Sequence, residues 1–252
     1  MVLGAIGMSA TEKSTLTFAG HAAQNETHIN FVGIERILNA NQIVTFIAQT
    51  TPDNLLRLAQ LVSAHERERA EKFRKVQDRN LSLISHGLKR LVLSQLLKLE
   101  PTSLVFDKTI KGKPFCSNND KYRFSLSHSG EWAALSVALK HEIGVDIEFA
   151  KDQEYLEIAD FCFTQKELGQ FIESNFDNLF FLKTWTQKES ITKATGDGLF
   201  LKFSNIDIHQ CESSESTVIE GIKYYVYSEA FYDGFISVAF NRPLTSLNIF
   251  II

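Results

Sequence analysis

Apolar residues follow two different spacings along the chain, and each spacing predicts a different kind of element. The run from Gln42 to Ala48 is β-branched and aromatic, which predicts a strand, and a helix is expected to begin near Pro52. From Leu81 to Leu99 apolar residues recur every three or four positions, which predicts a helix with one face on a core. The pattern stops at Pro101, because proline disfavours helical backbone in the residue before it.

A highly charged segment, SAHERERAEKFRKVQD at residues 63 to 78, precedes that apolar helix. Its sequence predicts a surface helix. Ser63 is expected to be the N-cap residue and Glu66 the third helical residue, and the two would form a capping box.

After residue 104 the apolar residues follow a period of two, which predicts strands, and helical spacing returns before a final group of strands. We therefore predict an α+β protein with two similar lobes, at residues 41–142 and 143–252, after an extension at 1–40. The extension is expected to be mobile or loosely packed, although Phe31 to Leu38 could pack. The expected strands cover 104–106, 123–126, 132–139, 143–149, 206–208, 222–226 and 235–240, and the expected helices cover 156–161, 164–173 and 178–194.

The composition suits one large core or two modest ones, since 44% of the 252 residues are hydrophobic. Three cysteines are too few and too far apart for a disulfide framework or a zinc site, which favours a reducing, cytoplasmic location. A net charge of −4 argues against nucleic-acid binding, and no stretch approaches the roughly 20 apolar residues that span a membrane. The apolar N-terminus lacks the basic residues of a secretory signal peptide.

The first candidate site is the sequence Gly144-Val-Asp-Ile-Glu148. Side chains in a strand alternate between two faces, so Asp146 and Glu148 are expected on the face opposite Val145 and Ile147. Two neighbouring carboxylates repel each other, and a bound Mg²⁺, which prefers oxygen ligands, would relieve the repulsion. The alternative is the solvated face of a half-buried strand.

The second candidate site is Trp185-Thr-Gln-Lys-Glu-Ser-Ile-Thr-Lys193. On a helix, Trp185, Glu189 and Lys193 lie four residues apart on one face, which could supply a third acidic ligand and a phosphate contact. The alternative is an ordinary pair of opposite charges on a helix surface. Gly196 and Gly198 are expected to end this helix.

The third candidate site combines Gly112-Lys-Pro114 with Phe124-Ser-Leu-Ser-His-Ser129. A lysine in a rigid turn, followed by a strand that ends in serine and histidine, brings a cation, hydroxyl groups and an imidazole to one end of a sheet. Such donors suit a polyanion. A solvated basic loop is the alternative, and a serine–histidine hydrolase pair is disfavoured because adjacent strand residues point to opposite faces.

In this order and spacing, the motifs resemble the 4′-phosphopantetheinyl transferase superfamily, specifically the monomeric, two-lobed type that modifies peptide and polyketide synthases. The resemblance extends from about residue 42 to residue 240 and includes Phe163-Thr-Gln-Lys-Glu-Leu168. It implies two α+β lobes related by a pseudo-twofold axis, with the active site in the cleft between them. It also implies transfer of the 4′-phosphopantetheine group from coenzyme A to a serine of an apo acyl or peptidyl carrier protein, releasing 3′,5′-ADP.

The resemblance implies a magnesium site and a set of catalytic residues. Asp146, Glu148 and Glu189 are expected to hold Mg²⁺ against the pyrophosphate of coenzyme A. Lys193 is expected to reach the pyrophosphate, and Lys188 to help it stabilise the leaving phosphate. Asp146, Glu189 and Lys193 are the expected catalytic residues, with Glu189 or a metal-bound water as the base for the carrier serine.

The resemblance also implies contacts to the nucleotide end of coenzyme A. Lys113, Ser127 and His128 are expected to contact the 3′-phosphate and the nucleotide. Arg69 and Ser82 fall where the family places further phosphate contacts from the first lobe.

Two positions depart from the family pattern. Glu66 stands where related enzymes often have a basic nucleotide contact, and Leu81 stands where an arginine is common. Glu167 matches a family carboxylate near the site, but Thr164 and Glu167 also have the spacing of a capping box, and both interpretations stay open. The basic residues that could compensate for the missing basic contacts at Glu66 and Leu81 are Arg67, Arg74, Lys75 and Arg79.

The alternative function is a coenzyme A or carrier-protein binding module that lacks catalysis, and the intact acidic residues argue against it. A magnesium-dependent nuclease or phosphatase is disfavoured because the sequence has no basic track or dedicated nucleophile. The expected partners are coenzyme A and an acidic carrier protein, which the basic residues 108 to 123 could steer. No nucleic-acid or membrane partner is expected, and the resemblance implies a monomer.

Overall fold

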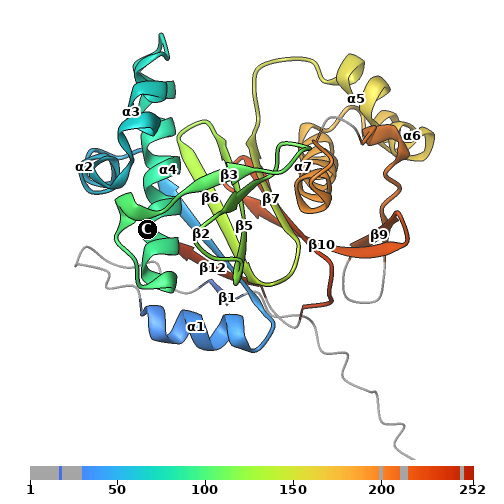
Figure 1. Ribbon diagram of the computed structural model, residues 1–252. Coiled ribbons are helices and arrows are strands. Elements are labelled where there is room, and N and C mark those ends of the chain that lie inside the picture. The colour runs from blue at the N-terminus through green and yellow to red at the C-terminus, as the bar shows by residue number, and fades with distance from the viewer. Residues whose placement is uncertain (1–16, 19–29, 199–200, 211–214, 245–246) are drawn as a thin grey trace, which may run out of the picture.

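Two five-stranded sheets form the centre of the protein, and helices cover each of them (Figure 1). The computed structural model describes residues 17–18, 30–198, 201–210, 215–244 and 247–252. The first sheet has the order β1 (Thr17–Phe18), β12 (Leu247–Ile251), β2 (Ile43–Gln49), β6 (Trp132–Leu139) and β5 (Tyr122–Ser129). The second has the order β7 (Ile143–Phe149), β11 (Gly234–Phe240), β10 (Ile222–Phe231), β9 (Glu215–Ile219) and β8 (His209–Gln210). A separate hairpin consists of β3 (Phe106–Lys108) and β4 (Pro114–Cys116).

Each sheet carries one long helix. On the first sheet this helix is α4 (Val76–Leu97), and the shorter helices beside it are α1 (Phe31–Asn39), α2 (Pro52–Leu58) and α3 (Ala64–Glu71). On the second sheet it is α7 (Asn178–Thr195), accompanied by α5 (Leu156–Cys162) and α6 (Gln165–Glu173). The predicted two-lobed α+β fold is confirmed. Within the described residues, no helix is long and apolar enough to cross a membrane.

The charged segment forms a shorter helix than its sequence predicts. Ser63 and Glu66 form the expected capping box at the start of α3. The helix ends at Glu71 instead of continuing to Asp78, and α4 begins at Val76. Ala70 is the last buried residue of α3, so no apolar stripe continues beyond it to hold further turns against α4.

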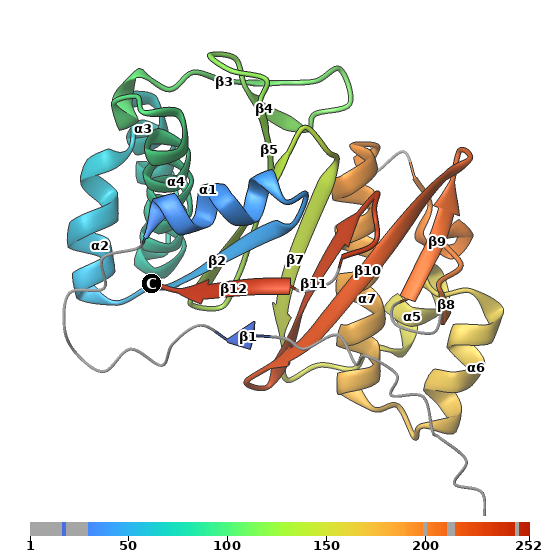
Figure 2. The same cartoon turned by 90° about the horizontal axis from the view of Figure 1, so that it is seen from below.

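The division into lobes differs from the predicted one at both ends of the chain. The segment 31–39, assigned to a loose extension, forms α1, and Ile34 and Leu38 are buried in the first core. Residues 247–251, assigned to the second lobe, form β12, which pairs in parallel with β2 of the first lobe (Figure 2). The rest of the predicted extension, apart from the short strand β1, lies outside the described residues.

The strand predicted at 104–106 forms later, as β3 at Phe106–Lys108, and the strand predicted at 206–208 does not form. Residues 206–208 follow a 3₁₀ turn at Phe203–Asn205 and are not paired in a sheet. Ile206 is buried in the core under α7, and its carbonyl oxygen accepts a hydrogen bond from Lys188 Nζ at 2.9 Å. A lysine side chain thus satisfies a carbonyl that a strand would pair with its neighbour.

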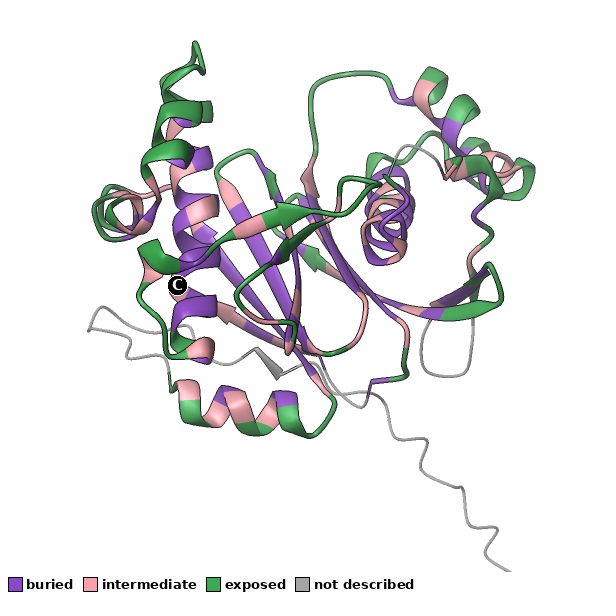
Figure 3. Cartoon of the chain, in the orientation of Figure 1, coloured by how far each residue is buried: buried purple, intermediate pink, exposed green. Residues whose placement is uncertain are grey.

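A shared apolar core connects the two sheets. Residues of β2 and β6 pack with residues of β7 and β11, including Ile47, Ala134, Ile147 and Ile236. Figure 3 shows the central strands and most of α4 and α7 buried, with exposed residues on the outer helices α2, α3, α5 and α6. The lobes therefore pack on each other through apolar contacts.

Gly144 allows α7 to pack directly on β7. A Cβ atom at this position would overlap the carbonyl oxygen of Ser190 and approach the backbone nitrogen of Ala194, both on α7. Only glycine lets the two backbones come this close. Because α7 lies directly on β7, side chains at the cleft end of both elements reach the same space.

We predict that Gly144→Ala lowers the free energy of unfolding by about 3 kcal/mol or more, because the added methyl group forces α7 away from β7. Urea unfolding of the purified protein measures the change. Gly169→Ala is the matched control, since a Cβ there meets nothing within 4 Å in α6, and alanine should stabilise that helix by about 0.5–1 kcal/mol. A Gly144→Ala protein as stable as the wild type would contradict the close packing.

Candidate functional site

Serine hydroxyl groups on β5 fix the positions of two carboxylates on β7. Ser127 Oγ donates a hydrogen bond to Asp146 Oδ1 at 2.7 Å, and Ser129 Oγ donates one to Glu148 Oε2 at 2.6 Å. The serines alternate along β5 and the acids alternate along β7, so matching side chains meet across the gap between the sheets. Asp146 and Glu148 thus share one face of their strand, as the alternation predicts.

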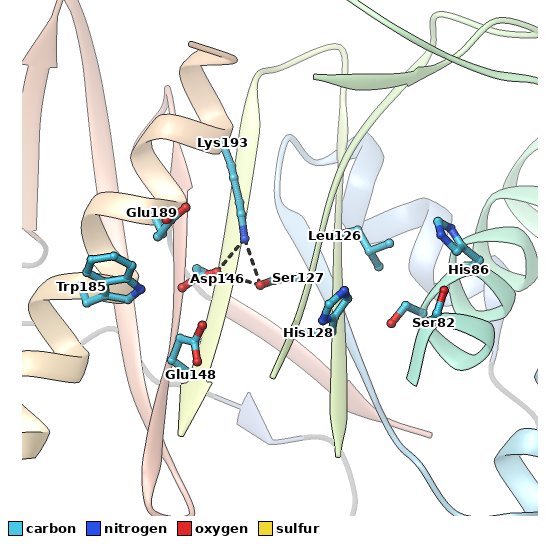
Figure 4. A pocket seen from close by; sticks show the side chains of 11 residues that line it. Ser82, His86, Leu126, Ser127, His128, Asp146, Glu148, Trp185, Glu189 and Lys193 are labelled. Atoms are coloured by element: carbon cyan, nitrogen blue, oxygen red, sulfur yellow. Dashed lines mark hydrogen bonds and ion pairs between the residues drawn. The ribbon is translucent and has the colours of Figure 1, made fainter. Parts of the chain in front are cut away.

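The carboxylates line a cavity of about 310 Å³ between the lobes, here called the carboxylate cavity (Figure 4). Asp146 and Glu148 extend into it from β7, and Glu189 extends from α7. On the other side, Ser82 of α4 and His128 of β5 line it. The three predicted metal ligands therefore lie around one cavity at the junction of the lobes.

Lys193 occupies the middle of this cavity. Its Nζ atom donates hydrogen bonds to Asp146 Oδ1 at 2.6 Å and to Ser127 Oγ at 2.9 Å (Figure 4). Trp185, Glu189 and Lys193 line the cavity from one face of α7, which agrees with their four-residue spacing.

The predicted set of three carboxylate ligands is not preformed. Among the described residues, no group of three histidine, cysteine or acidic side chains is arranged to hold a metal ion. The ammonium group of Lys193 pairs with Asp146 Oδ1 instead. Asp146 Oδ2 is buried and has no hydrogen-bond partner among the described residues. A buried carboxylate oxygen without a donor is a suitable ligand for a cation, so the residue types fit Mg²⁺.

The electrostatics of the cavity favour a bound cation. Burial raises the pKa of Asp146, although the charge of Lys193 and hydrogen bonds from Lys193 and Ser127 oppose the increase. Burial also raises the pKa of Glu189, and the negative charges of Asp146 and Glu148 raise it further. The three carboxylates thus repel one another inside a poorly solvated cavity, and a divalent cation would reduce that repulsion.

A second cavity, of about 430 Å³, adjoins the first and is here called the basic cavity. Arg69 of α3 lines it, and Ser82, His86 and His128 line both cavities. The structure therefore brings together three residues predicted to contact phosphate, Arg69, Ser82 and His128, at the first-lobe side of the cleft.

Comparison with known families matches both lobes. A model for the N-terminal domain of 4′-phosphopantetheinyl transferase matches residues 49–140, and the model of the 4′-phosphopantetheinyl transferase superfamily matches residues 142–238. The 4′-phosphopantetheinyl transferase Ffp of Bacillus subtilis is 31% identical over 164 residues, which cover 64% of this chain and 72% of that protein. The chain belongs to the 4′-phosphopantetheinyl transferase superfamily.

Two further relatives are also named as 4′-phosphopantetheinyl transferases. The 4′-phosphopantetheinyl transferase HetI of Nostoc sp. is 32% identical over 164 residues, 62% of this chain and 69% of the relative. The 4′-phosphopantetheinyl transferase Sfp of Bacillus subtilis is 27% identical over 164 residues, 64% of this chain and 72% of the relative. This transferase is therefore an enzyme that moves 4′-phosphopantetheine from coenzyme A to carrier proteins, as its superfamily does.

Glu66 of the transferase is neutralised inside the first lobe. Lys89 Nζ donates to Glu66 Oε1 at 2.9 Å, and Arg90 Nε donates to Glu66 Oε2 at 2.5 Å. Burial alone would raise the pKa of Glu66, but hydrogen bonds and charge from Arg90 and Lys89 lower it to about 2. The glutamate at this family position is therefore an internal anion paired with two cations.

None of the four basic residues suggested as replacements lines the basic cavity as far as the structure describes it. Arg67, for example, donates to the carbonyl oxygen of Ala59 at 2.5 Å. The additional basic residues of this cavity are His65 and Lys72. Together with Arg69 they follow helical spacing of four and three residues, a signal that is present in the sequence.

Lys113 lies one cavity away from the carboxylates. It lines a third cavity, of about 210 Å³, which shares Leu126 and Lys193 with the carboxylate cavity. Its ammonium group donates to Glu142 and to the carbonyl oxygen of Ala194, the latter at 2.7 Å. The structure thus connects the Gly-Lys-Pro turn to the C-terminal end of α7, and a contact with the nucleotide stays a prediction.

Lys188 does not lie in the cleft, contrary to its predicted role. It is fully buried, and its Nζ atom donates to the carbonyl oxygens of Phe203 and Ile206 at 2.8 and 2.9 Å. It also pairs with Glu167 Oε2 at 2.7 Å. A neighbour of Glu189 in sequence points about 100° away around a helix, so Lys188 faces the core of the second lobe.

Glu167 is a structural residue in this arrangement. Its carboxylate accepts from the backbone N–H of Thr164 at 2.8 Å, which completes the capping box of α6, and the same oxygen pairs with Lys188. The contacts therefore support the structural one of the two interpretations left open by the sequence.

We predict that Glu66→Gln lowers the free energy of unfolding of the transferase by about 3 kcal/mol at pH 7, because Lys89 and Arg90 lose their counter-ion. The pKa of Glu66 is about 2 in the folded protein and 4.5 without perturbation, so its stabilisation is present above about pH 4.5. The difference between the two proteins should shrink as the pH falls from 5 to 3. Urea unfolding at several pH values measures it.

Glu68→Gln on the same helix is the matched control, because Glu68 is exposed. It should change the stability by less than about 0.5 kcal/mol at every pH. A constant difference between wild type and Glu66→Gln from pH 7 to pH 3 would contradict the low pKa.

Proposed function

We propose that this transferase uses Asp146, Glu148 and Glu189 to hold Mg²⁺ against the pyrophosphate of coenzyme A during transfer to an apo acyl or peptidyl carrier protein. The observation that carries the proposal is the meeting of three carboxylates, from β7 and α7, around one cavity at the junction of the lobes. The buried, unpartnered Oδ2 atom of Asp146 supports a cation there. When bound, Mg²⁺ would neutralise the pyrophosphate and polarise its phosphoryl oxygens.

Lys193 is the residue proposed to contact the pyrophosphate. Its ammonium group already lies in the carboxylate cavity, where it donates to Asp146 and Ser127. A flexible lysine side chain can exchange these acceptors for phosphate oxygens when the substrate enters. Asp146 would then be free to bind the metal.

The proposed reaction moves one group and one proton. The carrier serine Oγ attacks the phosphorus that bears pantetheine, and the bond from that phosphorus to the bridging oxygen of the nucleotide breaks. 3′,5′-ADP leaves with the electron pair, and Lys193 stabilises its charge by hydrogen bonding. Glu189 accepts the serine proton, since its carboxylate lines the cavity and is destabilised as an anion there.

The nucleotide end of coenzyme A is proposed to lie toward the basic cavity. Ser82 and His128 line both cavities, so a ligand that extends from one to the other passes them. Arg69 supplies positive charge beyond this junction. All these residues come from a single chain, which supports a monomer as the active form.

The basic surface proposed to steer the carrier protein is partly neutralised. Lys111 pairs with Asp197, and Lys113 and Arg123 both pair with Glu142. Steering by residues 108 to 123 should therefore be weaker than their formal charge implies.

We predict that the wild type adds the mass of one phosphopantetheine group to an apo carrier protein in the presence of coenzyme A and Mg²⁺. Asp146→Asn should reduce the transfer rate by at least about a hundredfold, because the amide is a poor magnesium ligand. Intact-protein mass spectrometry measures the product. The fold should persist, since asparagine keeps the shape of the side chain and its acceptor for Ser127.

Glu35→Gln on α1 is the control, because it removes one carboxylate outside the cleft, and it should transfer at the wild-type rate. Removal of Mg²⁺ by a chelator should stop transfer, and added Mg²⁺ should restore it. A fully active Asp146→Asn protein would refute the metal assignment. Failure of the wild type to modify any apo carrier protein would contradict the transferase activity itself.

A further inference from the structure

His86 projects from α4 at the junction of the two cavities, where it lies among residues proposed to contact coenzyme A (Figure 4). We propose that His86 is a specificity-determining residue that donates a hydrogen bond from Nε2 to the 3′-phosphate of coenzyme A. The inference rests on the proposed function, because it concerns the nucleotide end of the same substrate.

The neighbours of His86 determine which ring nitrogen carries the proton. Lys89 Nζ lies 3.3 Å from His86 Nδ1, whereas Glu66 Oε1, which accepts from Lys89, lies farther from that nitrogen, at 3.6 Å. An ammonium group is only a donor, so this contact is favourable when Nδ1 is the acceptor and the proton is on Nε2. Lys89 is buried, whereas about a quarter of the His86 side chain is exposed, 27% against 7%. His86 lines both cavities, and in this tautomer the N–H group is on the ring edge away from Lys89.

Two contacts favour the cationic form of Lys89, although burial lowers its pKa. Its Nζ atom donates to Glu66 Oε1 at 2.9 Å and lies 3.7 Å from the centre of the Phe106 ring. Burial and the charge of Lys89 lower the pKa of His86 to about 4, so the imidazole is neutral near pH 7. His86 is therefore a neutral donor, and its contact with Lys89 favours the tautomer with the proton on Nε2.

The surroundings of His86 favour a phosphate that binds without a metal. Among the described residues that line the basic cavity, none is acidic, and His65, Arg69 and Lys72 supply donors from one side. The carboxylate cavity, by contrast, has three acids and needs a cation before it accepts an anion. In coenzyme A the 3′-phosphate is the phosphate group separate from the pyrophosphate, so it matches the basic cavity.

Glu66 gains an indirect role in this arrangement. A glutamate at this position cannot itself contact a phosphate, but it holds Lys89, and Lys89 orients His86. Lys89 and Glu66 are therefore positioning residues. In this chain a neutral donor, His86, would contact the phosphate in place of a basic residue, and the buried charges of Lys89 and Glu66 would orient it.

The test compares coenzyme A with 3′-dephospho-coenzyme A by isothermal titration calorimetry on the full chain. His86→Leu should weaken binding of coenzyme A about tenfold and leave binding of 3′-dephospho-coenzyme A unchanged, because only the former offers the acceptor. His86→Gln, which keeps a neutral donor, should recover part of the loss. In the transfer assay the same variants should raise KM for coenzyme A with little change in kcat.

His209→Leu is the matched control, because His209 is an exposed residue of β8, on the outer strand of the second sheet, and it should bind both compounds as the wild type does. Equal weakening of both compounds in His86→Leu, or no weakening of either, would overturn the inference. Binding does not require transfer, so a wild type that discriminates between the compounds without modifying a carrier would contradict only the proposed function.

The tautomer is tested on the wild type, which avoids a variant that fails to fold. Long-range ¹H–¹⁵N correlation spectra of ¹⁵N-histidine-labelled protein near pH 7 should show the His86 proton on Nε2. A proton on Nδ1, or on both nitrogens, would overturn the inference.

Discussion

The site depends on the direct packing of α7 against β7 at Gly144. Because no side chain separates the two backbones there, Glu189 and Lys193 of the helix reach the same space as Asp146 of the strand. On the other side of β7, the hydroxyl of Ser125 accepts the backbone N–H of Val145 at 3.0 Å, and the next two serines in alternation bond the acidic side chains. β7 is thus held between α7 of its own lobe and β5 of the other lobe. These contacts determine where the side chains of the cleft lie.

This packing produces two neighbouring environments of opposite charge. The carboxylate cavity concentrates acids that burial destabilises, so it favours a cation. The basic cavity concentrates donors from α3 and α4, so it favours an anion directly. Coenzyme A carries a pyrophosphate and a separate phosphate, and we propose that the carboxylate cavity binds the first with a cation and that the basic cavity binds the second. Ser82, His86 and His128 belong to both cavities and set where one environment ends and the other begins.

The sequence correctly predicted the features that depend on residues close together in the chain. The capping box at Ser63, the strand containing Asp146 and the face of α7 shared by Glu189 and Lys193 follow from spacing alone, and the structure contains all three. The pairing of distant strands could not be predicted from spacing. β12 pairs with β2, some 200 residues away in sequence, and the apolar pattern of a strand does not show which strand it pairs with. Lys188 was misplaced for a related reason, since a motif gives an order of residues but not which of two adjacent side chains faces the core. The ion pair between Lys193 and Asp146 could not be predicted from the sequence either, because it forms between α7 and β7 where they meet in the cleft.

We propose that three carboxylates would hold a divalent cation once Lys193 leaves Asp146 for the pyrophosphate. Anomalous diffraction from crystals grown with Mn²⁺ and coenzyme A would locate the cation. The expected result is a manganese peak bound by oxygens of Asp146, Glu148 and Glu189 and by the pyrophosphate, with Lys193 Nζ on a phosphate oxygen. A pyrophosphate bound in the cleft without a metal at these carboxylates, or a peak at a different set of residues, would contradict it.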